Sequence, residues 1–332
     1  MSTTTLSLAD ARQLVVDVFA KAGMPAHLAA PAAQALVMAE QEGLPSHGLA
    51  RAPFYAAQMV AGKVVADAAP TVERDGAVIR VDAGLGLAFA AIAAAAQAAR
   101  DVVAELGVAA VSVTRSHHFG VAGQAVEPFA REGLIALAFA NAPAAMAPWG
   151  GNKPLYGTNP IAFAAPRAKG DPLLIDLSLS HVARGKVMLA QKAGQAIPEG
   201  WALDVDGNPT TDADAAMAGT MVPSGGAKGA ALALMVELLT AGLAGAHFAY
   251  QASSLFDDKG PAPNLAHFML VLDPARFAPG FTDRAEAIFA AIESQDGARL
   301  PGARRMAERA SRADQIDIPQ QLYDTLTGLA RG

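Results

Sequence analysis

Apolar residues near the N-terminus recur at the three- to four-residue spacing of amphipathic helices. Ser7 with Asp10 has the pattern of a capping box at the start of the first helix. A Gly-Met-Pro run at residues 23–25 ends that helix, and a second helix is predicted over Ala29–Glu42. We therefore expect residues 6–62 to be helical.

In the middle of the chain, short apolar runs typical of strands alternate with helical stretches. The predicted strands are Val78–Val81, Val108–Thr114, Leu134–Ala140, Ile161–Ala164, Leu173–Leu177 and Phe268–Leu272. The predicted helices between them span residues 87–105, 121–132, 182–193 and 228–244. A helical tail is expected from Thr282, with a break at Pro301 and Gly302.

Composition and charge exclude several classes of protein. Hydrophobic residues make up 52% and charged residues 17% of the 332 residues, which favours a well-packed globular protein. A net charge of −6 without a Lys/Arg run argues against a nucleic-acid partner. The chain has no cysteine, which excludes disulfides and thiolate ligands, and no histidine spacing indicates zinc, so we expect no metal.

The most apolar run, residues 229–246, raises the question of a membrane span. It carries Glu237 at its middle, and a charge inside the bilayer is costly, so we interpret the run as a buried helix of a soluble protein. The N-terminus also lacks a basic region followed by an apolar core, so we expect no signal peptide and a cytoplasmic location.

No standard nucleotide-binding motif is present. The nearest approach to a Rossmann fingerprint, residues 84–89, ends on phenylalanine instead of glycine. The glycine-rich run around Lys228 has the wrong spacing for a P-loop. If the chain binds a dinucleotide, it does so by a non-Rossmann route.

The segment Ser46-His47-Gly48-Leu49-Ala50-Arg51 carries the most informative chemistry. We expect it to open a helical stretch through Tyr55 to about Val60, on which His47 and Arg51 share one face. Arginine can grip a carboxylate with two hydrogen bonds, and histidine can protonate the neighbouring oxygen. A plain surface pair, with Ser46 as an N-cap, is the alternative reading.

Four further segments combine polar side chains with glycines or a helix start. They are Arg115–Gly120, Tyr156–Pro160, Asp176–Ser180 and Gly225–Gly229. A glycine lets a ligand approach the backbone, and a helix N-terminus with a lysine suits an anion such as pyrophosphate. Taken singly, each segment also fits a turn or a helix cap.

Taken together and in this order, the motifs resemble the type 2 malate/L-lactate dehydrogenase family. The matching motifs are Ser46-His47-Gly48 with Arg51, Ser116-His117-His118-Phe119-Gly120, Tyr156-Gly157-Thr158-Asn159-Pro160, Asp176 followed by Val182-Ala183-Arg184-Gly185-Lys186, Ile197-Pro198-Glu199-Gly200-Trp201, Asn208-Pro209-Thr210-Thr211-Asp212 and Gly225-Gly226-Ala227-Lys228-Gly229. The resemblance covers about residues 5–325. This family differs from the Rossmann lactate dehydrogenases, which agrees with the missing fingerprint.

The resemblance implies an α+β fold and a homodimer. It implies a non-Rossmann NAD(P)-binding domain with a largely antiparallel sheet, and a helical domain formed by the N- and C-terminal segments. We expect the boundaries to be 1–72 for the helical N-terminal domain, 73–280 for the cofactor domain, and 281–332 for C-terminal helices that pack back on the N-terminal domain.

The resemblance also implies hydride transfer between NAD(P)H and a small 2-oxo or 2-hydroxy acid of the malate, lactate or sulfolactate type. By similarity, His47 is the proton donor in its imidazolium form, Ser46 its hydrogen-bond partner, Arg51 the carboxylate clamp and Thr158 a substrate contact. The implied cofactor contacts are His117, His118, Phe119, Gly120, Val121, Asp176, Leu177, Ser178, Ala227, Lys228, Gly302, Ala303 and Arg304.

Four alternatives stay open. In some relatives the residue matching His118 is the acid/base, although the shared helical face with Arg51 makes us prefer His47. Another branch reduces cyclic imines such as piperideine-2-carboxylate and pyrroline-2-carboxylate; some of those relatives carry an acidic residue near the place of Lys186, where this chain has Arg184-Gly185-Lys186, which slightly favours oxo acids. A non-catalytic ligand-binding relative is a further reading, and the sequence does not decide between NAD and NADP.

Overall fold

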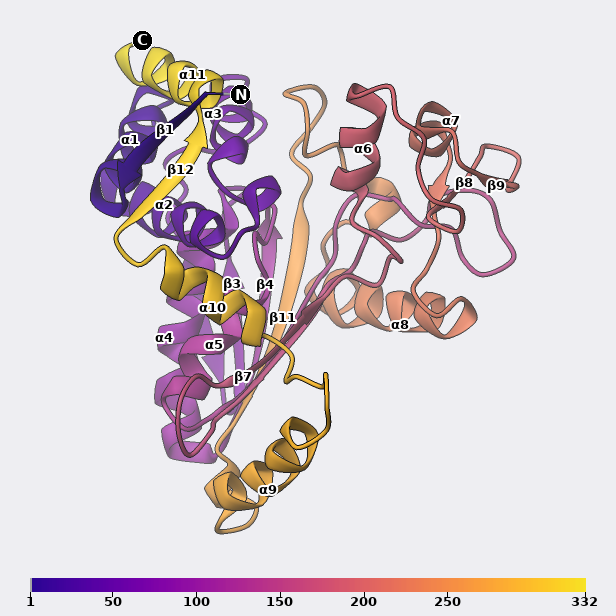
Figure 1. Ribbon diagram of the computed structural model, residues 1–332. Coiled ribbons are helices and arrows are strands. Elements are labelled where there is room, and N and C mark those ends of the chain that lie inside the picture. The colour runs from indigo at the N-terminus through magenta and orange to yellow at the C-terminus, as the bar shows by residue number, and fades with distance from the viewer. Residues whose placement is uncertain (1) are drawn as a thin grey trace.

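A central sheet of seven strands organises the computed structural model, which describes residues 2–332 (Figure 1). The strand order is β2-β3-β4-β11-β5-β6-β7, and only the β3–β4 pair is parallel. The strands are β2 Thr71–Asp75, β3 Val78–Asp82, β4 Val108–Ser116, β5 Ile135–Ala140, β6 Ile161–Ala165, β7 Leu173–Leu177 and β11 Leu265–Leu272. The prediction of an α+β fold with a largely antiparallel sheet is confirmed.

Two helices cover one face of this sheet. They are α4 Ala88–Leu106 and α5 Gly123–Arg131, and both form contacts with the strands beneath them. Small side chains dominate the shared core, with alanines of α4 packed against Ile79, Val81, Val111 and Val113. The alanine richness of the sequence therefore corresponds to close packing of helix on sheet.

The two chain ends build one helical domain, as the family resemblance implied. Its helices are α1 Leu8–Lys21, α2 Ala26–Gln41, α3 Ala52–Val60 and α11 Gln320–Arg331. Ser7 caps α1 by accepting a hydrogen bond from the Asp10 N–H at 3.0 Å, which confirms the predicted cap. Figure 1 shows both termini at the same end of the molecule.

A strand pair that the sequence did not reveal joins the two ends. β1 Thr3–Ser7 pairs antiparallel with β12 Gln315–Pro319, although we expected helix from residue 6 and in the tail. Each strand has only five residues, and the two lie about three hundred residues apart in the sequence. The pairing of two such short and distant segments is fixed by tertiary contact and cannot be read from either segment alone.

A third region lies beside β5–β7 and carries the remaining short elements. They are α6 Arg184–Lys192, α7 Ala213–Ala218, α8 Ala227–Glu237, and a small sheet of β8 Ala202–Leu203, β9 Pro209–Thr210 and β10 Thr220–Met221. Figure 1 shows this region to the right of the helical domain. Between the sheet and β12 the chain forms α9 Phe281–Glu293 and α10 Ala303–Ser311. The domain boundaries at residues 72 and 280 stay a prediction.

The apolar run at 229–246 forms α8 and a π-helical turn, Leu238–Gly242. Glu237 is buried, where it accepts hydrogen bonds from the Asn159 amide at 2.8 Å and the Ala249 N–H at 3.0 Å. The expectation of a fully buried helix is wrong for the opposite face, because Leu234 and Leu238 are exposed. Within residues 2–332, no helix combines the length and apolar character of a bilayer span.

Candidate active site

His47 and Arg51 lie on two separate 3-10 turns rather than on one helix. The first turn is η1 Pro45–His47 and the second is η2 Leu49–Arg51. Helix α3 begins only at Ala52, so the prediction of one continuous helix across both residues is wrong. The two side chains are nevertheless kept within one short segment.

A buried carboxylate separates these turns. The Glu40 side chain, from α2, accepts a hydrogen bond from the Leu49 N–H at 2.8 Å, and both groups are buried. A Cβ on Gly48 would overlap that carboxylate, so only glycine fits there. The local spacing of His47 and Arg51 suited a helix, but this contact from the preceding helix, nine residues before Leu49, favours two separate turns.

The His47 side chain is half-buried and lies next to Ser46 and His118. Ser46 Oγ lies 3.1 Å from its Nδ1, and the ring of His118 lies 5.5 Å away, centroid to centroid. Burial, followed by the positive charge of Arg51, lowers the pKa of His47 to about 4. In the free protein His47 is therefore neutral at pH 7, and its role as a proton donor in the imidazolium form stays a prediction.

Arg51 is buried, and aromatic rings surround its guanidinium. The Cζ atom lies 4.7 Å from the ring centroid of Phe256, 5.4 Å from Tyr55 and 5.6 Å from Phe54. Its Nη2 donates to the Leu255 carbonyl at 3.0 Å, whereas Nε has no partner among the described residues. A buried donor without a partner is costly, which favours a ligand acceptor at this guanidinium.

His118, the other acid/base candidate, is held by Tyr55. The Tyr55 hydroxyl lies 2.6 Å from His118 Nδ1. Burial lowers the pKa of His118 well below its usual value, and the charge of Arg51 adds to the effect. Sequence reasoning did not select Tyr55, because its partner His118 lies 63 positions further along the chain and the contact leaves no local signal.

His117 is fully buried and has no hydrogen-bond partner on either ring nitrogen within residues 2–332. Burial, then the charges of Arg51 and Lys63, lowers its pKa to about 3. Next to it, Ser116 Oγ lies 3.0 Å from His267 Nε2 and Phe119 stacks on His267. Two unpartnered ring nitrogens fit a polar ligand group, such as an amide.

Asp176 connects three elements beside this cluster. Its Oδ2 accepts the Gly123 N–H from the start of α5 at 2.8 Å and Arg305 Nη1 from α10 at 2.7 Å. The charges of Asp176 and Arg305 both act on the pKa of His47, which places this pair near the imidazole. Arg305 was not among the predicted site residues, whereas its neighbour Arg304 was and is exposed.

Backbone hydrogen bonds bring three of the predicted segments together. Leu179 N–H donates to the Thr158 carbonyl and Ser224 N–H donates to the Leu179 carbonyl, both at 2.8 Å. The Thr158 loop, the Asp176–Ser180 segment and the start of α8 are thus neighbours. A Cβ on Gly185, at the start of α6, would lie 3.9 Å from Ser46 Cβ, so α6 approaches the first turn as well.

The remaining predicted cofactor contacts differ in exposure. Phe119 and Val121 are buried, and Gly120 has a φ of +78°. The others are at least partly exposed: Leu177, Ser178, Ala227, Lys228, Gly302 and Ala303. Their roles, like those of His47, Ser46, His118, Arg51 and Thr158, stay predictions. Among residues 2–332, no cluster of three or more His, Asp or Glu side chains is arranged to hold a metal ion.

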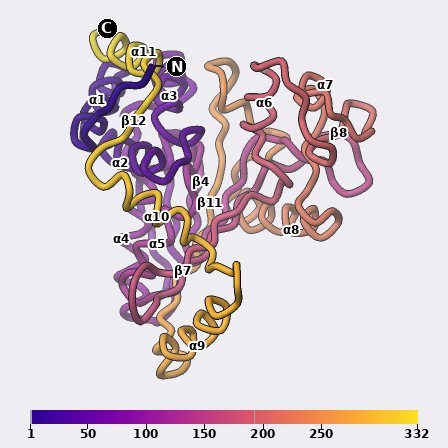
Figure 2. The backbone as a smooth tube through the Cα atoms, viewed as in Figure 1, coloured from indigo at the N-terminus to yellow at the C-terminus, as the bar shows by residue number. Residues whose placement is uncertain are grey.

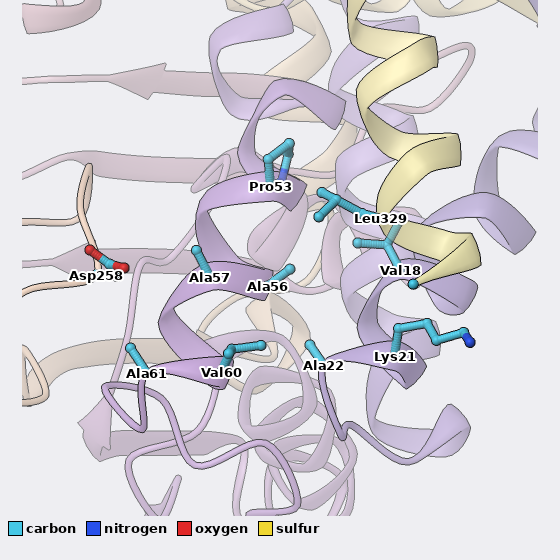
Figure 3. A pocket seen from close by; sticks show the side chains of 11 residues that line it. Val18, Lys21, Ala22, Pro53, Ala56, Ala57, Val60, Ala61, Asp258 and Leu329 are labelled. Atoms are coloured by element: carbon cyan, nitrogen blue, oxygen red, sulfur yellow. The ribbon is translucent and has the colours of Figure 1, made fainter.

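A separate groove of about 410 Å³ lies on the outer side of α3. Figure 3 shows Pro53, Ala56 and Val60 of α3 facing Val18 and Leu329 across it. None of the predicted site residues lines this groove. Its lining is almost entirely aliphatic, which does not suit a charged acid or a dinucleotide.

Comparison with known proteins gives a family match over almost the whole chain. A family model described as malate/L-lactate dehydrogenase matches residues 6–327. A (2R)-3-sulfolactate dehydrogenase (NADP(+)) from Chromohalobacter salexigens is 59% identical over 325 residues, which are 98% of this chain and 98% of that protein. A Delta(1)-pyrroline-2-carboxylate/Delta(1)-piperideine-2-carboxylate reductase from Pseudomonas syringae pv. tomato is 39% identical over 99% of this chain and 97% of that protein.

The fold matches solved structures equally well. The sulfolactate dehydrogenase from Methanocaldococcus jannaschii superimposes with a TM-score of 0.91 at 29% identity, covering 99% of this chain and 97% of that one. The turns that carry His47 and Arg51 therefore lie within a chain that is similar to dehydrogenases from end to end.

Proposed function

The chain belongs to the malate/L-lactate dehydrogenase family, and we propose that it oxidises 3-sulfolactate to sulfopyruvate with NADP as the hydride acceptor. It is an NAD(P)-dependent oxidoreductase that acts on a small 2-oxo or 2-hydroxy acid. The observation that carries the finer proposal is the 59% identity to a (2R)-3-sulfolactate dehydrogenase (NADP(+)) along both full chains.

The described residues fit a nicotinamide dinucleotide. The two unpartnered nitrogens of buried His117 suit a carboxamide. Lys228 and the left-handed backbone at Gly225 and Gly226, with φ of +69° and +64°, suit a pyrophosphate at the start of α8, which has no side-chain cap. When bound, the nicotinamide supplies the hydride acceptor for oxidation or the donor for reduction.

Two site residues then have separate roles toward the substrate: Arg51 binds the carboxylate, and His47 transfers the proton. The Arg51 guanidinium binds the substrate carboxylate, with Nε as a donor that has no partner among the described residues, and this fixes the position of the adjacent C2 atom. In oxidation, His47 is neutral and accepts the proton of the 2-hydroxyl at Nε2, while Nδ1–H donates to Ser46 Oγ. In reduction, the His47 imidazolium returns that proton to the carbonyl oxygen.

An absorbance assay at the reduced-nicotinamide band tests this function. Sulfopyruvate, pyruvate, oxaloacetate and piperideine-2-carboxylate are compared with NADPH and with NADH. We expect the highest kcat/KM for sulfopyruvate with NADPH. The highest kcat/KM for the cyclic imine would favour the reductase activity of the 39% identical relative, and no turnover of any compound would favour a non-catalytic ligand-binding protein.

The pH dependence of the two directions should differ because the pKa of His47 is lowered to about 4. Reduction needs the imidazolium, so kcat/KM for the 2-oxo acid should fall about tenfold per pH unit from pH 5 to 8. Oxidation needs the neutral ring, which is the dominant form throughout this range. The titration of His47 should therefore cause no fall in kcat/KM for the 2-hydroxy acid between pH 8 and pH 5. Rates of both reactions across this range check the prediction. A limb centred near pH 6.5 would contradict it.

Lys228 should contribute to cofactor binding. Lys228→Glu places a negative charge at the start of α8, so we expect NADPH to bind about tenfold more weakly, about 1.4 kcal/mol. Lys228 is exposed, so the fold should stay intact. Fluorescence titration measures the dissociation constant, and Lys153→Glu is a matched control with an exposed lysine outside the predicted contacts. An unchanged constant in folded Lys228→Glu would place the pyrophosphate elsewhere, such as near Gly302.

We further propose a homodimer and a cytoplasmic location. Support for the dimer comes from the apolar face of α8 and the turn after it, where Leu232, Leu234, Leu238 and Leu243 are exposed. Adjacent exposed leucines in a soluble protein are typical of an interface. Light scattering should give twice the chain mass, and fractionation of expressing cells tests the location.

A further inference from the structure

Lys63, just after α3, is a buried cation that the proposed chemistry does not use. Only 2% of the residue is exposed. Its Nζ donates to the carbonyls of Ser254 and Lys259, each at 2.7 Å, and to the Asp257 carbonyl at 3.2 Å. The partly exposed Asp257 carboxylate lies 3.3 Å away. Because a buried ammonium needs all its acceptors, these carbonyls are held in place around it.

The carbonyls belong to a segment that we term the strap, residues 252–263, between η4 Ala249–Gln251 and β11. Figure 2 shows it as an orange loop that rises from β11 beside the helical domain. Gln58 of α3 adds a second tie by donating to the Asp257 carbonyl at 2.8 Å. In Figure 3, Asp258 lies next to the Ala57 and Ala61 side of α3. The strap is thus attached along the end of α3.

The same strap contacts Arg51. The Leu255 carbonyl, one residue after Ser254, accepts Arg51 Nη2 at 3.0 Å. The Phe256 ring lies 4.7 Å from Arg51 Cζ and packs edge-on against Phe54. The strap therefore supplies one hydrogen bond and one face of the aromatic surroundings of the guanidinium.

We propose that Lys63 is a positioning residue: by holding the strap, it fixes the Arg51 guanidinium in the orientation that receives the substrate carboxylate. This inference rests on the proposed function. A free arginine side chain loses considerable rotamer entropy when it grips a ligand. A guanidinium already fixed by Leu255 and Phe256 loses less, so substrate binds more tightly.

Lys63→Met tests this role, with Asp257→Asn as the matched control. The methionine removes the charge that holds three carbonyls, so we expect KM for the 2-oxo acid to rise about tenfold or more, with kcat less affected, because the loss is in ground-state binding. The dissociation constant of NADPH should change less than about twofold. Asp257→Asn leaves the carbonyls in place and should raise KM less than about threefold. Equal effects of the two variants would overturn the proposal, since the surface ion pair would then carry the effect.

A double-mutant cycle with Arg51→Lys separates positioning from general stability. If Lys63 acts through Arg51, then Lys63→Met in the Arg51→Lys background should change kcat/KM less than about twofold, since coupled sites are not additive. The same loss in both backgrounds would mean that Lys63 has a structural role only. If Lys63→Met does not fold, Phe256→Leu is used in the same cycle, because Phe256 is exposed and its loss removes the ring over Arg51 together with one edge contact to Phe54.

Hydrogen exchange provides a readout that does not depend on catalysis. In Lys63→Met, amide exchange should increase in residues 252–263 and also in residues 49–55, which carry Arg51. An increase in the strap alone, or none, would overturn the proposal. If the wild-type protein turns over no 2-oxo acid, the proposed function fails, and exchange still decides whether Lys63 fixes the Arg51 segment.

Discussion

Replacement of His47 by asparagine is expected to lower turnover about 10²–10⁴-fold while NADPH binding stays near the wild-type value. The amide cannot accept the hydroxyl proton or return it to the carbonyl oxygen. It can still occupy the space beside Ser46 and His118, so the site should keep its shape. Steady-state kinetics in both directions, with a fluorescence titration of NADPH, measure the two quantities.

His118→Asn is the matched comparison for this prediction. His118 is buried against Tyr55 and its pKa is lowered well below the usual value. We therefore expect a smaller loss of turnover and a larger loss of cofactor affinity than for His47→Asn. Wild-type turnover in the His47 variant, together with its loss in the His118 variant, would reverse the roles assigned to these two residues.

Arg51→Lys is expected to lower kcat/KM for a 2-oxo acid at least about tenfold, the equivalent of one charge-assisted hydrogen bond. Lysine keeps the charge but has no planar fork for a carboxylate. It also loses the cation–π contacts of the guanidinium with Phe256, Tyr55 and Phe54, and it cannot both reach the Leu255 carbonyl and bind the substrate in the same way. Initial rates over a range of substrate concentrations give the measurement.

Two further results make this prediction specific. The binding of NADPH should be unchanged in Arg51→Lys, because the guanidinium is assigned to the substrate and not to the cofactor. The thermal unfolding temperature of the variant is measured as a control, so that a loss of folded protein is not mistaken for a lower kcat/KM. Kinetics equal to wild type in a folded Arg51→Lys protein would place the substrate carboxylate elsewhere.

Long periodic patterns predicted much of the fold. Amphipathic spacing identified α1, α2 and α4, and apolar runs identified the strands from β3 to β7 and β11. The strand β2 and the small sheet of β8, β9 and β10 were missed. All five residues of β2 are exposed, and the strands of the small sheet have two residues each, so neither leaves an apolar pattern in the sequence.

The candidate site was predictable as a set of residues but not as an arrangement. The order of the motifs from Ser46 to Gly229 pointed to the family, and the family model matches. Arg305, Tyr55 and Lys63 were not selected, because each acts through a contact with a residue far away in the sequence. Such contacts have no local signature.

The sequence by itself determined which chemistry the chain carries. Proton transfer and carboxylate binding need an imidazole and a guanidinium, and the types and order of His47, Arg51 and the later motifs were enough to identify the enzyme family. Only the tertiary structure decided the backbone conformation, the protonation and the orientation of these side chains. Glu40 separates the two turns, burial with Arg51 makes His47 neutral, and the strap holds the guanidinium. The physical reason is that backbone conformation, pKa and side-chain orientation depend on surroundings supplied by distant segments, whereas the chemical identity of a side chain does not.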